Sequence, residues 1–535
     1  MPELITHMQP QAELGCALRQ LGQQLATAGR FDEARQSLEL SLDLFPGQAE
    51  CHFDLANACY ASGRLDASIA EYRHAVRLDP RLSAAWYNLG VVLMQSETSG
   101  GPMKEAEHAY RRALRFRPNQ PETHNNLAIL LQSTGREKEA IQHYRSAAAL
   151  CPGFHEPRFN LGSLLQDLGR LEEARLVFEE LLADCPDHTE ALNNLANVLT
   201  ELGAHAEARV RFETVLEIDP AHTLSRWNLG LNQLRTGDWE PGWKNYDSRF
   251  RQSGTGSRRS ERPLWDGREL NGARLLLTAE QGMGDLMQAA RFVRAVAARG
   301  ARIALECHPP LSDLFSRLPE VECVFNVGTE PPDHDCWLPV MSLPLVLGVT
   351  LENLPADVPY LDADPDRVEY WRQRLAQWKG VRAGLAWSGN PKFRVNSKRS
   401  LAPADVRRIS KLVQQSEGEP VHLFSLQKGV PVPTGAKLIP LDDDPSSMGE
   451  LAAVMMNLDL ILSVDTSVAH LAGALGRPVW TFLAFHADWR WMTAEHAGSP
   501  WYPTMRLLRQ TRQGDWSSVI EEVGAGLATI RGGGH

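Results

Sequence analysis

The chain has 535 residues, enough for three or four domains of ordinary size, each with its own buried core. Its 55 Lys and Arg against 66 Asp and Glu give a net charge of −11, which argues against a dedicated nucleic-acid-binding protein. The 8 Cys residues show neither metal-type nor disulfide-type spacing, and the most apolar runs, 338–351 and 451–464, are too short to span a bilayer. We therefore expect a cytoplasmic protein with no membrane span.

Pro and Gly recur at a fixed spacing through the first half of the chain. Most neighbours in each series lie 34 residues apart, and one interval holds four extra residues, which we place in the turn at 96–102. The series are Pro46, Pro80, Pro118, Pro152, Pro186 and Pro220, and Gly29, Gly63, Gly135, Gly169, Gly203 and Gly237. Each unit thus predicts two antiparallel amphipathic helices, with Gly in the turn between them and Pro after the second.

Small and apolar residues recur at equivalent positions of these units and predict where the helices pack. The recurring residues are Leu21, Leu55, Leu89, Leu127, Leu161, Leu195 and Leu229 in the first helix, and Ala34, Ser68, Ala106, Ala140, Ala174 and Ala208 in the second, where an aromatic residue usually follows four positions later. The pattern resembles the tetratricopeptide repeat family over about residues 12–250. We expect an α-solenoid of about seven repeats, the last of which is a cap.

A set of Asn residues, here called the Asn row, recurs once in each of five successive repeats. Asn88, Asn126, Asn160, Asn194 and Asn228 occupy one position in successive repeats. Each carboxamide offers a donor and an acceptor, so the row could bind the main chain of an extended protein acceptor in the solenoid groove. Asn is also common at this position in the repeat family, and a structural role stays open.

From residue 272 the pattern changes to β-rich runs that alternate with amphipathic helices. The runs are 273–280, 301–308, 321–327, 381–389, 420–427, 436–442, 459–465 and 478–484. This alternation predicts two Rossmann-like lobes, 272–375 and 376–535, with a crevice between them. Residues 251–271 are predicted to be a linker.

Two motifs carry a family resemblance. The string SVDTSVAHLAGALGRPVW (463–480) resembles the nucleotide-sugar motif of glycosyltransferase family 9, the lipopolysaccharide heptosyltransferases, and AEQGMGDLMQAARFV (279–293) resembles the acceptor-lobe motif of that group. The order of motifs is similar to bacterial proteins that fuse tetratricopeptide repeats to such a domain, and the plan is similar to flagellin glycosyltransferases and O-GlcNAc transferase. The resemblance implies a GT-B transferase whose C-terminal lobe binds the nucleotide sugar and whose N-terminal lobe faces the acceptor.

The DTS segment is the candidate donor site, because it follows a buried strand and opens a helix whose amides and positive end suit a diphosphate. We expect Thr466 and Ser467 to bind phosphate and His470 to contact phosphate or ribose. Asp465 belongs to the same motif, although it could simply cap the helix, and His470 could be an ordinary helix histidine.

The turn after the first strand is the candidate catalytic segment. The resemblance implies that Asp285 is the general base, which would take the proton of the acceptor hydroxyl during in-line attack on the anomeric carbon. Capping of the following helix is its alternative role. Gly282 and Gly284 would let the backbone approach acceptor or donor closely.

The loop 390–400 carries cations that suit a departing nucleoside diphosphate. Lys398 and Arg399 are the expected contacts, whereas Lys392 and Arg394 are expected to be solvated. The acidic run at 441–447 could suggest a metal, but turn and capping chemistry explains it better. We therefore expect metal-independent chemistry, with no cofactor besides the nucleotide-sugar substrate.

These features together predict an inverting glycosyltransferase that acts on a protein hydroxyl held by the repeats. Two alternatives remain. One is transfer to a lipid-linked or polysaccharide glycan, and the other is a non-catalytic scaffold whose transferase-like half only binds nucleotide. The sequence shows no counterpart of the His-containing acceptor motif of O-GlcNAc transferase, which argues against a UDP-GlcNAc donor.

Overall fold

The computed structural model describes residues 2–96, 102–251, 260–390, 396–415, 419–441, 447–496 and 498–531. The chain divides into two compact units, Met1–Ala204 and His205–His535. Among the described residues, a search for helices long and apolar enough to cross a membrane finds none.

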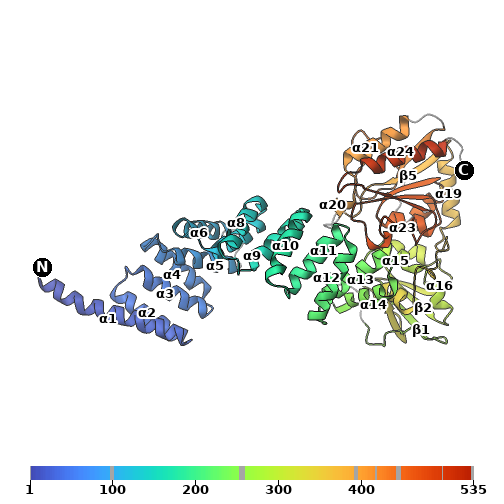
Figure 1. Cartoon of the computed structure of the whole chain (residues 1–535). Coiled ribbons are helices and arrows are strands. Elements are labelled where there is room, and N and C mark those ends of the chain that lie inside the picture. Colours follow the sequence, from blue (N-terminus) through green and yellow to red (C-terminus); the bar gives the residue numbers. More distant parts are fainter. Residues whose placement is uncertain are drawn as a thin grey trace. The chain divides into compact units, whose positions relative to one another are not determined.

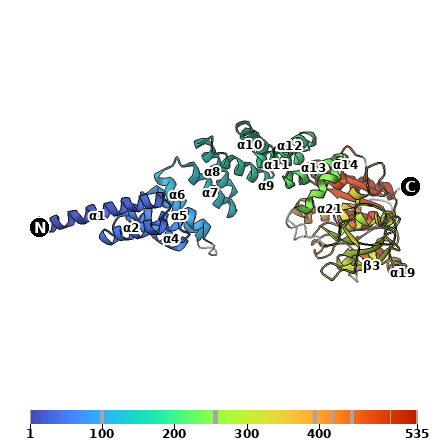
Figure 2. The same ribbon diagram turned by 90° about the horizontal axis from the view of Figure 1, so that it is seen from below.

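The first unit consists of helices that run back and forth as successive pairs (Figures 1 and 2). They are α1 (Pro2–Thr27), α2 (Phe31–Leu44), α3 (Ala49–Ala61), α4 (Leu65–Leu78), α5 (Ser83–Gln95), α6 (Pro102–Phe116), α7 (Pro121–Ser133), α8 (Glu137–Leu150), α9 (Glu156–Asp167), α10 (Leu171–Asp184) and α11 (Thr189–Glu201). The predicted four-residue insertion, at 96–102, falls between α5 and α6 and lies largely outside the described residues. The α-solenoid expected from the repeat pattern is confirmed.

The predicted packing positions of the repeats are buried, with one exception. Ala34, Ser68 and their equivalents are 0% exposed, and the aromatic ring that follows four positions later is at most 1% exposed in each repeat that has one. Leu21, however, is 46% exposed, whereas the equivalent Leu55 is 4% exposed. Leu21 lies in the first repeat, so no earlier repeat covers its side chain. The turn glycines between paired helices have positive φ, as expected.

The second unit begins with three further helices of the repeat series. They are α12 (His205–Ile218), α13 (Thr223–Thr236) and α14 (Trp239–Tyr246), and the 3-10 turn η1 (Asp247–Arg251) follows. The residue at which we expected the solenoid to end, 250, therefore lies inside the second unit.

A four-stranded parallel sheet forms the first lobe of the second unit. Its strands, in the order β3-β2-β1-β4, are β1 (Arg274–Thr278), β2 (Arg302–Cys307), β3 (Val321–Asn326) and β4 (Cys336–Pro339). The short helices of this lobe are α15 (Met283–Ala290), α16 (Val293–Ala297), η2 (Pro309–Leu311), α17 (Ser312–Phe315), η3 (Val340–Ser342) and α18 (Leu343–Val346).

A five-stranded parallel sheet forms the second lobe. Its strands, in the order β6-β5-β7-β8-β9, are β5 (Val381–Ala386), β6 (Val421–Ser425), β7 (Leu460–Val464), β8 (Val479–Leu483) and β9 (Met505–Arg509). The helices are α19 (Pro365–Leu375), α20 (Asn396–Arg399), α21 (Pro403–Gln415), α22 (Met448–Met455), α23 (Ser467–Ala474), η4 (Trp489–Trp491) and α24 (Ser517–Arg531). The two sheets confirm the predicted α/β fold of two lobes.

The strand predictions fail in three places. Of the predicted strand 436–442, the described residues 436–441 form no strand, and among them only Ile439 makes a bridge to β6. Pro440 lacks an amide hydrogen, so the segment cannot continue a ladder there. Two strands, β4 and β9, were not predicted, and each lies at the edge of its sheet. β4 has only four residues, and β9 carries Arg at two of its five positions.

Candidate functional site

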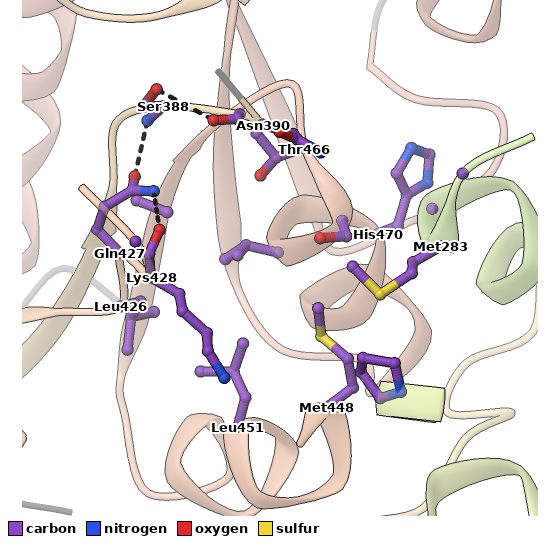
Figure 3. Close-up of a pocket in the computed structure, with 18 of the residues that line it drawn as sticks. Met283, Ser388, Asn390, Leu426, Gln427, Lys428, Met448, Leu451, Thr466 and His470 are labelled. Atoms are coloured by element: carbon purple, nitrogen blue, oxygen red, sulfur yellow. Dashed lines mark hydrogen bonds between the residues drawn. The ribbon is translucent and has the colours of Figure 1, made fainter. Parts of the chain in front are cut away.

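A cavity of about 1020 Å³ lies between the two lobes of the second unit. The turn before α15 and the start of that helix line one side of it, and the N-terminus of α23 lines the other. Further walls come from the segments after β5 and β6 and from the loop around η4. Figure 3 shows Met283 of the first lobe and His470 of the second among the residues that line the cavity. The cavity therefore collects residues from the carboxyl edges of both parallel sheets, where ligands bind in open α/β folds.

Asp285 lines this cavity from the first turn of α15. Its Oδ2 accepts a hydrogen bond of 2.7 Å from the amide of Gly282, the residue that caps the helix. Its Oδ1 accepts a hydrogen bond from Nη2 of Arg490. Asp285 thus makes the helix-capping hydrogen bond that we considered as its alternative role. It also lines the cavity, as a catalytic residue must.

Gly284 is needed for the close approach of α15 to α23, which lie side by side (Figure 1). A Cβ atom at Gly284 would lie 2.7 Å from Cδ2 of His470, whereas one at Gly282 would come no closer than 3.3 Å to Asp285 Oδ2. We had expected both glycines to let backbone approach a ligand. At Gly284 the close neighbour is a side chain of the opposite lobe.

Thr466 occupies the N-cap position of α23, so the alternative role of Asp465 as the cap of this helix is wrong. Thr466 Oγ1 lies 3.3 Å from Ser463 Oγ, and both Thr466 and Ser467 line the cavity. The first amides of a helix have no acceptor within that helix, and they carry the positive end of its dipole. This wall of the cavity therefore offers hydrogen-bond donors to an anion.

His470 lies one turn further into α23 and is buried, with 5% of its surface exposed. Its Nδ1 hydrogen-bonds to the hydroxyl of Tyr502 at 2.9 Å, and its ring packs against Trp491 at a centroid distance of 5.2 Å. Burial, followed by the positive charge of Arg490, lowers the pKa of His470 to about 3. The imidazole is therefore neutral at pH 7 and lines the cavity as a polar, uncharged group.

Two further carboxylates line the cavity, namely Asp465 of the donor motif and Asp488, which precedes η4. Burial, together with the neighbouring Asp488, raises the pKa of Asp465 to about 6. Burial also disfavours the charge of Asp488, but Arg490 outweighs that effect and holds the pKa of Asp488 below its ordinary value. Asp488 Oδ1 accepts a 2.7 Å hydrogen bond from Arg490 Nη1.

Of the two cations predicted to contact the donor, Lys398 and Arg399, only Arg399 lies at the cavity. Arg399 lines the cavity from the end of α20, whereas Lys398 is exposed and does not line it. The positive charge of Lys398 instead contributes to a lowered pKa at His486, after burial and Arg235. Lys392 and Arg394 lie outside the described residues, as does most of the acidic run at 441–447.

The sequence analysis missed the roles of Arg490, Asp488 and Gln427. Gln427 follows β6, and its Oε1 accepts hydrogen bonds from the amides of Trp387 (3.1 Å) and Ser388 (2.8 Å), which shapes the wall after β5 (Figure 3). Asp488 and Arg490 belong to the segment ADWRW (487–491). Two charged residues that alternate with two tryptophans were the available signal.

The Asn row makes contacts between repeats. Asn88, Asn126, Asn160 and Asn194 lie in the first unit and Asn228 in the second, and all five are half-buried. In the first unit each Nδ2 donates to a side chain of the preceding repeat, namely Asn57 (2.9 Å), Tyr87 (3.4 Å), Asn125 (3.2 Å) and Ser163 (3.2 Å). These bonds support the structural role. Each side-chain oxygen is a further acceptor, so peptide binding stays a prediction.

A search of the described residues for metal-type clusters finds one group, His52, Glu71 and His74, on α3 and α4 of the first unit. His52 Nδ1 hydrogen-bonds to Glu71 at 2.6 Å, and its Nε2 lies 3.1 Å from the carbonyl oxygen of Pro46. Both ring nitrogens therefore have protein partners.

Comparisons with known proteins match the two halves of the chain to different families. Residues 17–39, 56–97, 103–153 and 156–221 match sequence models of tetratricopeptide repeats. Residues 445–512 match glycosyltransferase family 9 (heptosyltransferase). The chain therefore carries tetratricopeptide repeats followed by a family 9 segment, as the sequence motifs indicated, and this combination supports a glycosyltransferase with a repeat scaffold.

Individual relatives cover parts of the chain. Protein FlbA of Caulobacter vibrioides is 27% identical over 319 residues, which are 54% of this chain and 52% of that protein, so the chain spans about half the length of this curated relative. The crystal structure of YrrB, described as a TPR protein with an unusual peptide-binding site, is 24% identical and covers 35% of this chain and 95% of its own, with a TM-score of 0.32. The crystal structure of MamA is 23% identical and covers 30% of this chain and 92% of its own, with a TM-score of 0.29.

Proposed function

We propose that the chain is an inverting glycosyltransferase that moves a sugar from a nucleotide-sugar donor to a hydroxyl group of a protein acceptor. The cavity between the lobes carries this proposal. It brings Asp285 of the acceptor lobe to the same space as Thr466, Ser467 and His470 of the donor lobe.

The donor-lobe wall suits the diphosphate of a nucleotide sugar. The N-terminus of α23 supplies amides and a positive dipole, and Arg399 adds a full positive charge on the same cavity. Positive charge placed here stabilises the nucleoside diphosphate as it departs. We assign donor binding to this wall, with the neutral His470 as a hydrogen-bonding group beside it.

The acceptor-lobe wall supplies the base. Asp285 is held at both oxygens, by the Gly282 amide and by Arg490, but each carboxylate oxygen has two lone pairs. A lone pair that faces the cavity can take the proton of an acceptor hydroxyl while its oxygen attacks the anomeric carbon. The C–O bond to the diphosphate breaks on the opposite face, and its electron pair leaves with the nucleoside diphosphate. Because the acceptor oxygen attacks from the face away from the leaving group, the configuration at the anomeric carbon is inverted.

We assign recognition of the acceptor to the repeats. The side-chain oxygens of the Asn row suit an extended main chain, because backbone amides donate to carboxamide oxygens whatever the side-chain sequence. The tetratricopeptide matches support a protein acceptor over a glycan.

The first test is thermal stabilisation of the purified chain by ADP, GDP, UDP and CMP sugars. A ligand that binds only the folded protein raises the apparent melting temperature. Arg399→Ala should abolish the shift. The stabilising donor, labelled in its sugar, is then supplied to cell extract with the wild-type chain.

Asp285→Asn should lower transfer about 100-fold to 10,000-fold while the nucleotide still binds, because it removes a general base. Asp366→Asn is the matched control, since Asp366 lies in the first turn of α19 and does not line the cavity. Label in protein supports the proposal, and label in lipid or polysaccharide identifies a glycan acceptor. Nucleotide binding without transfer from any donor points to the non-catalytic scaffold.

A further inference from the structure

Helix α14 presents an aromatic face to the transferase lobes, although it closes the repeat series. Trp239 stacks on Trp501 with ring centroids 5.1 Å apart, and Trp243 meets Trp489 edge-on at 5.4 Å. Trp243 Nε1 also donates to the carbonyl oxygen of Val349 at 3.0 Å. Trp239, Trp243 and Trp489 are each at most 3% exposed. The last repeat helix is therefore packed into the transferase core.

Trp489 leads directly to Arg490, whose guanidinium contacts three acceptors with its three nitrogen atoms. Nη2 donates to Asp285, Nε to Gln288 Oε1 at 2.8 Å, and Nη1 to Asp488 Oδ1 at 2.7 Å. The backbone of Arg490 is also fixed, because Trp501 Nε1 donates to its carbonyl oxygen at 2.9 Å. Arg490 itself is 6% exposed. A planar guanidinium with every nitrogen engaged has one orientation, so the carboxylate it holds has one as well.

The same repeat segment holds the other end of the Asp285 turn. Arg249 of η1 forms a two-pronged ion pair with Glu280 (2.9 and 2.7 Å), and both side chains are buried. Tyr246 of α14 accepts a 2.8 Å hydrogen bond from Gln281. Gln281 has φ +58°, a conformation that non-glycine residues adopt at a cost unless their surroundings hold them. Glu280 and Gln281 immediately precede Gly282, whose amide binds Asp285.

We infer that Arg490 is a positioning residue for the Asp285 carboxylate. Two segments fix this carboxylate, residues 280–282 and the segment that contains Arg490, and α14 and η1 hold them through Trp243, Tyr246 and Arg249. The inference rests on the proposed function of Asp285 as the base. It makes the last repeat helix part of the transfer machinery, in addition to its place at the end of the solenoid. It also explains why α13 and α14 belong to the same compact unit as the transferase lobes.

The kinetic test uses the full chain with the donor identified above, and it measures release of nucleoside diphosphate. Arg490→Ala should lower kcat about 100-fold, as expected when a reacting group is misplaced by about 1 Å, while the affinity for ADP, GDP or UDP stays within about threefold. Millimolar guanidinium, far below denaturing concentrations, should restore part of kcat. Arg490→Lys should fall between wild type and Arg490→Ala, because an ammonium cannot reproduce the planar contacts.

A second pair of variants tests the helix contact. Trp243→Phe should lower kcat by a smaller factor than Arg490→Ala and leave nucleotide affinity unchanged. Trp516→Phe is the matched control, since Trp516 is 5% exposed in the outer core of the second lobe and does not line the cavity. Unchanged kcat in Arg490→Ala, or equal effects of the two Trp variants, would overturn the inference.

Hydrogen exchange separates this inference from the proposed function. Arg490→Ala and Trp243→Phe should speed amide exchange in the segment 280–288, and Trp516→Phe should not. If the wild-type chain shows no turnover with any donor, the proposed function fails, but the exchange result still decides whether α14 and Arg490 hold this turn. Unchanged exchange in both variants would then reject the positioning role.

Discussion

One exposed ion pair of the first unit and one buried ion pair of the second show how burial changes what such a pair contributes. In the first unit, Arg170, which precedes α10, pairs with Glu173 in the first turn of that helix, and the two side chains are 40% and 43% exposed. In the second unit, Arg249–Glu280 joins η1 to the end of β1, and the side chains are 2% and 1% exposed. Exposed pairs contribute little to stability, whereas removing one partner of a buried pair leaves an uncompensated charge. We therefore expect the first unit to tolerate loss of Arg170, and the second unit not to tolerate loss of Arg249.

The largest expected effect is that of Arg249→Ala. Loss of this guanidinium leaves Glu280 buried without its cation, which should lower the free energy of unfolding of the second unit by about 3–5 kcal/mol. Urea unfolding followed by tryptophan fluorescence measures this, because Trp86 is the single tryptophan of residues 1–204 and the other 13 lie in the second unit. Arg170→Ala, the control, should change stability by less than about 0.5 kcal/mol. Similar losses in both variants would contradict the comparison.

Gly284→Ala tests how tightly the two lobes are joined at the cavity. The added Cβ would lie 2.7 Å from His470, so one of the two helices must shift, at a cost of about 1–3 kcal/mol. In the first unit, an added Cβ at Gly153 meets nothing within 4 Å, so Gly153→Ala is the matched control. The same fluorescence-detected unfolding should show a loss for Gly284→Ala, and calorimetry should show no loss for Gly153→Ala. Full stability of Gly284→Ala would mean that the helices separate freely.

Two histidines give the units opposite pH responses. The pKa of His470 is lowered, by burial and then by Arg490, so its contribution to stability is fully present above its unfolded value of about 6.5 and is lost as pH falls toward 3. The hydrogen bond to Glu71 raises the pKa of His52, so that contribution is present below pH 6.5 and is lost as pH rises through the folded pKa.

Unfolding of the second unit measured at successive pH values checks the first response. His470 should add a loss of at most about 1.4 kcal/mol for each pH unit below 6.5, and His470→Gln should remove that slope. His52→Gln should leave the slope of the second unit unchanged. Identical pH profiles for wild type and His470→Gln would show that His470 is not held neutral.

The repeats were predictable in residue detail because one period of 34 fixes every helix and its buried face. The meeting of Asp285 with the DTS motif was also predictable in outline, since loops at the carboxyl ends of parallel strands converge. The ion pair of Asp285 with Arg490 was not predictable, because these residues are 205 positions apart and no periodic pattern relates them. Gly284 was interpreted as a ligand contact for the same reason, since only the packed structure shows that its neighbour is His470.

The smallest expected effect concerns the hydrogen bonds between repeats. Asn88 Nδ2 donates to Asn57 at 2.9 Å and to the Tyr72 hydroxyl at 3.2 Å, and all three side chains lie within the first unit. Asn88→Ala removes both bonds, which should lower the local opening energy of α3–α5 by about 1 kcal/mol. Because each repeat contacts chiefly its neighbours, hydrogen exchange should rise in α3, α4 and α5 and stay unchanged in α9–α11. A rise that extends along the whole unit would show that the first unit opens cooperatively. We expect such cooperative opening only of the second unit.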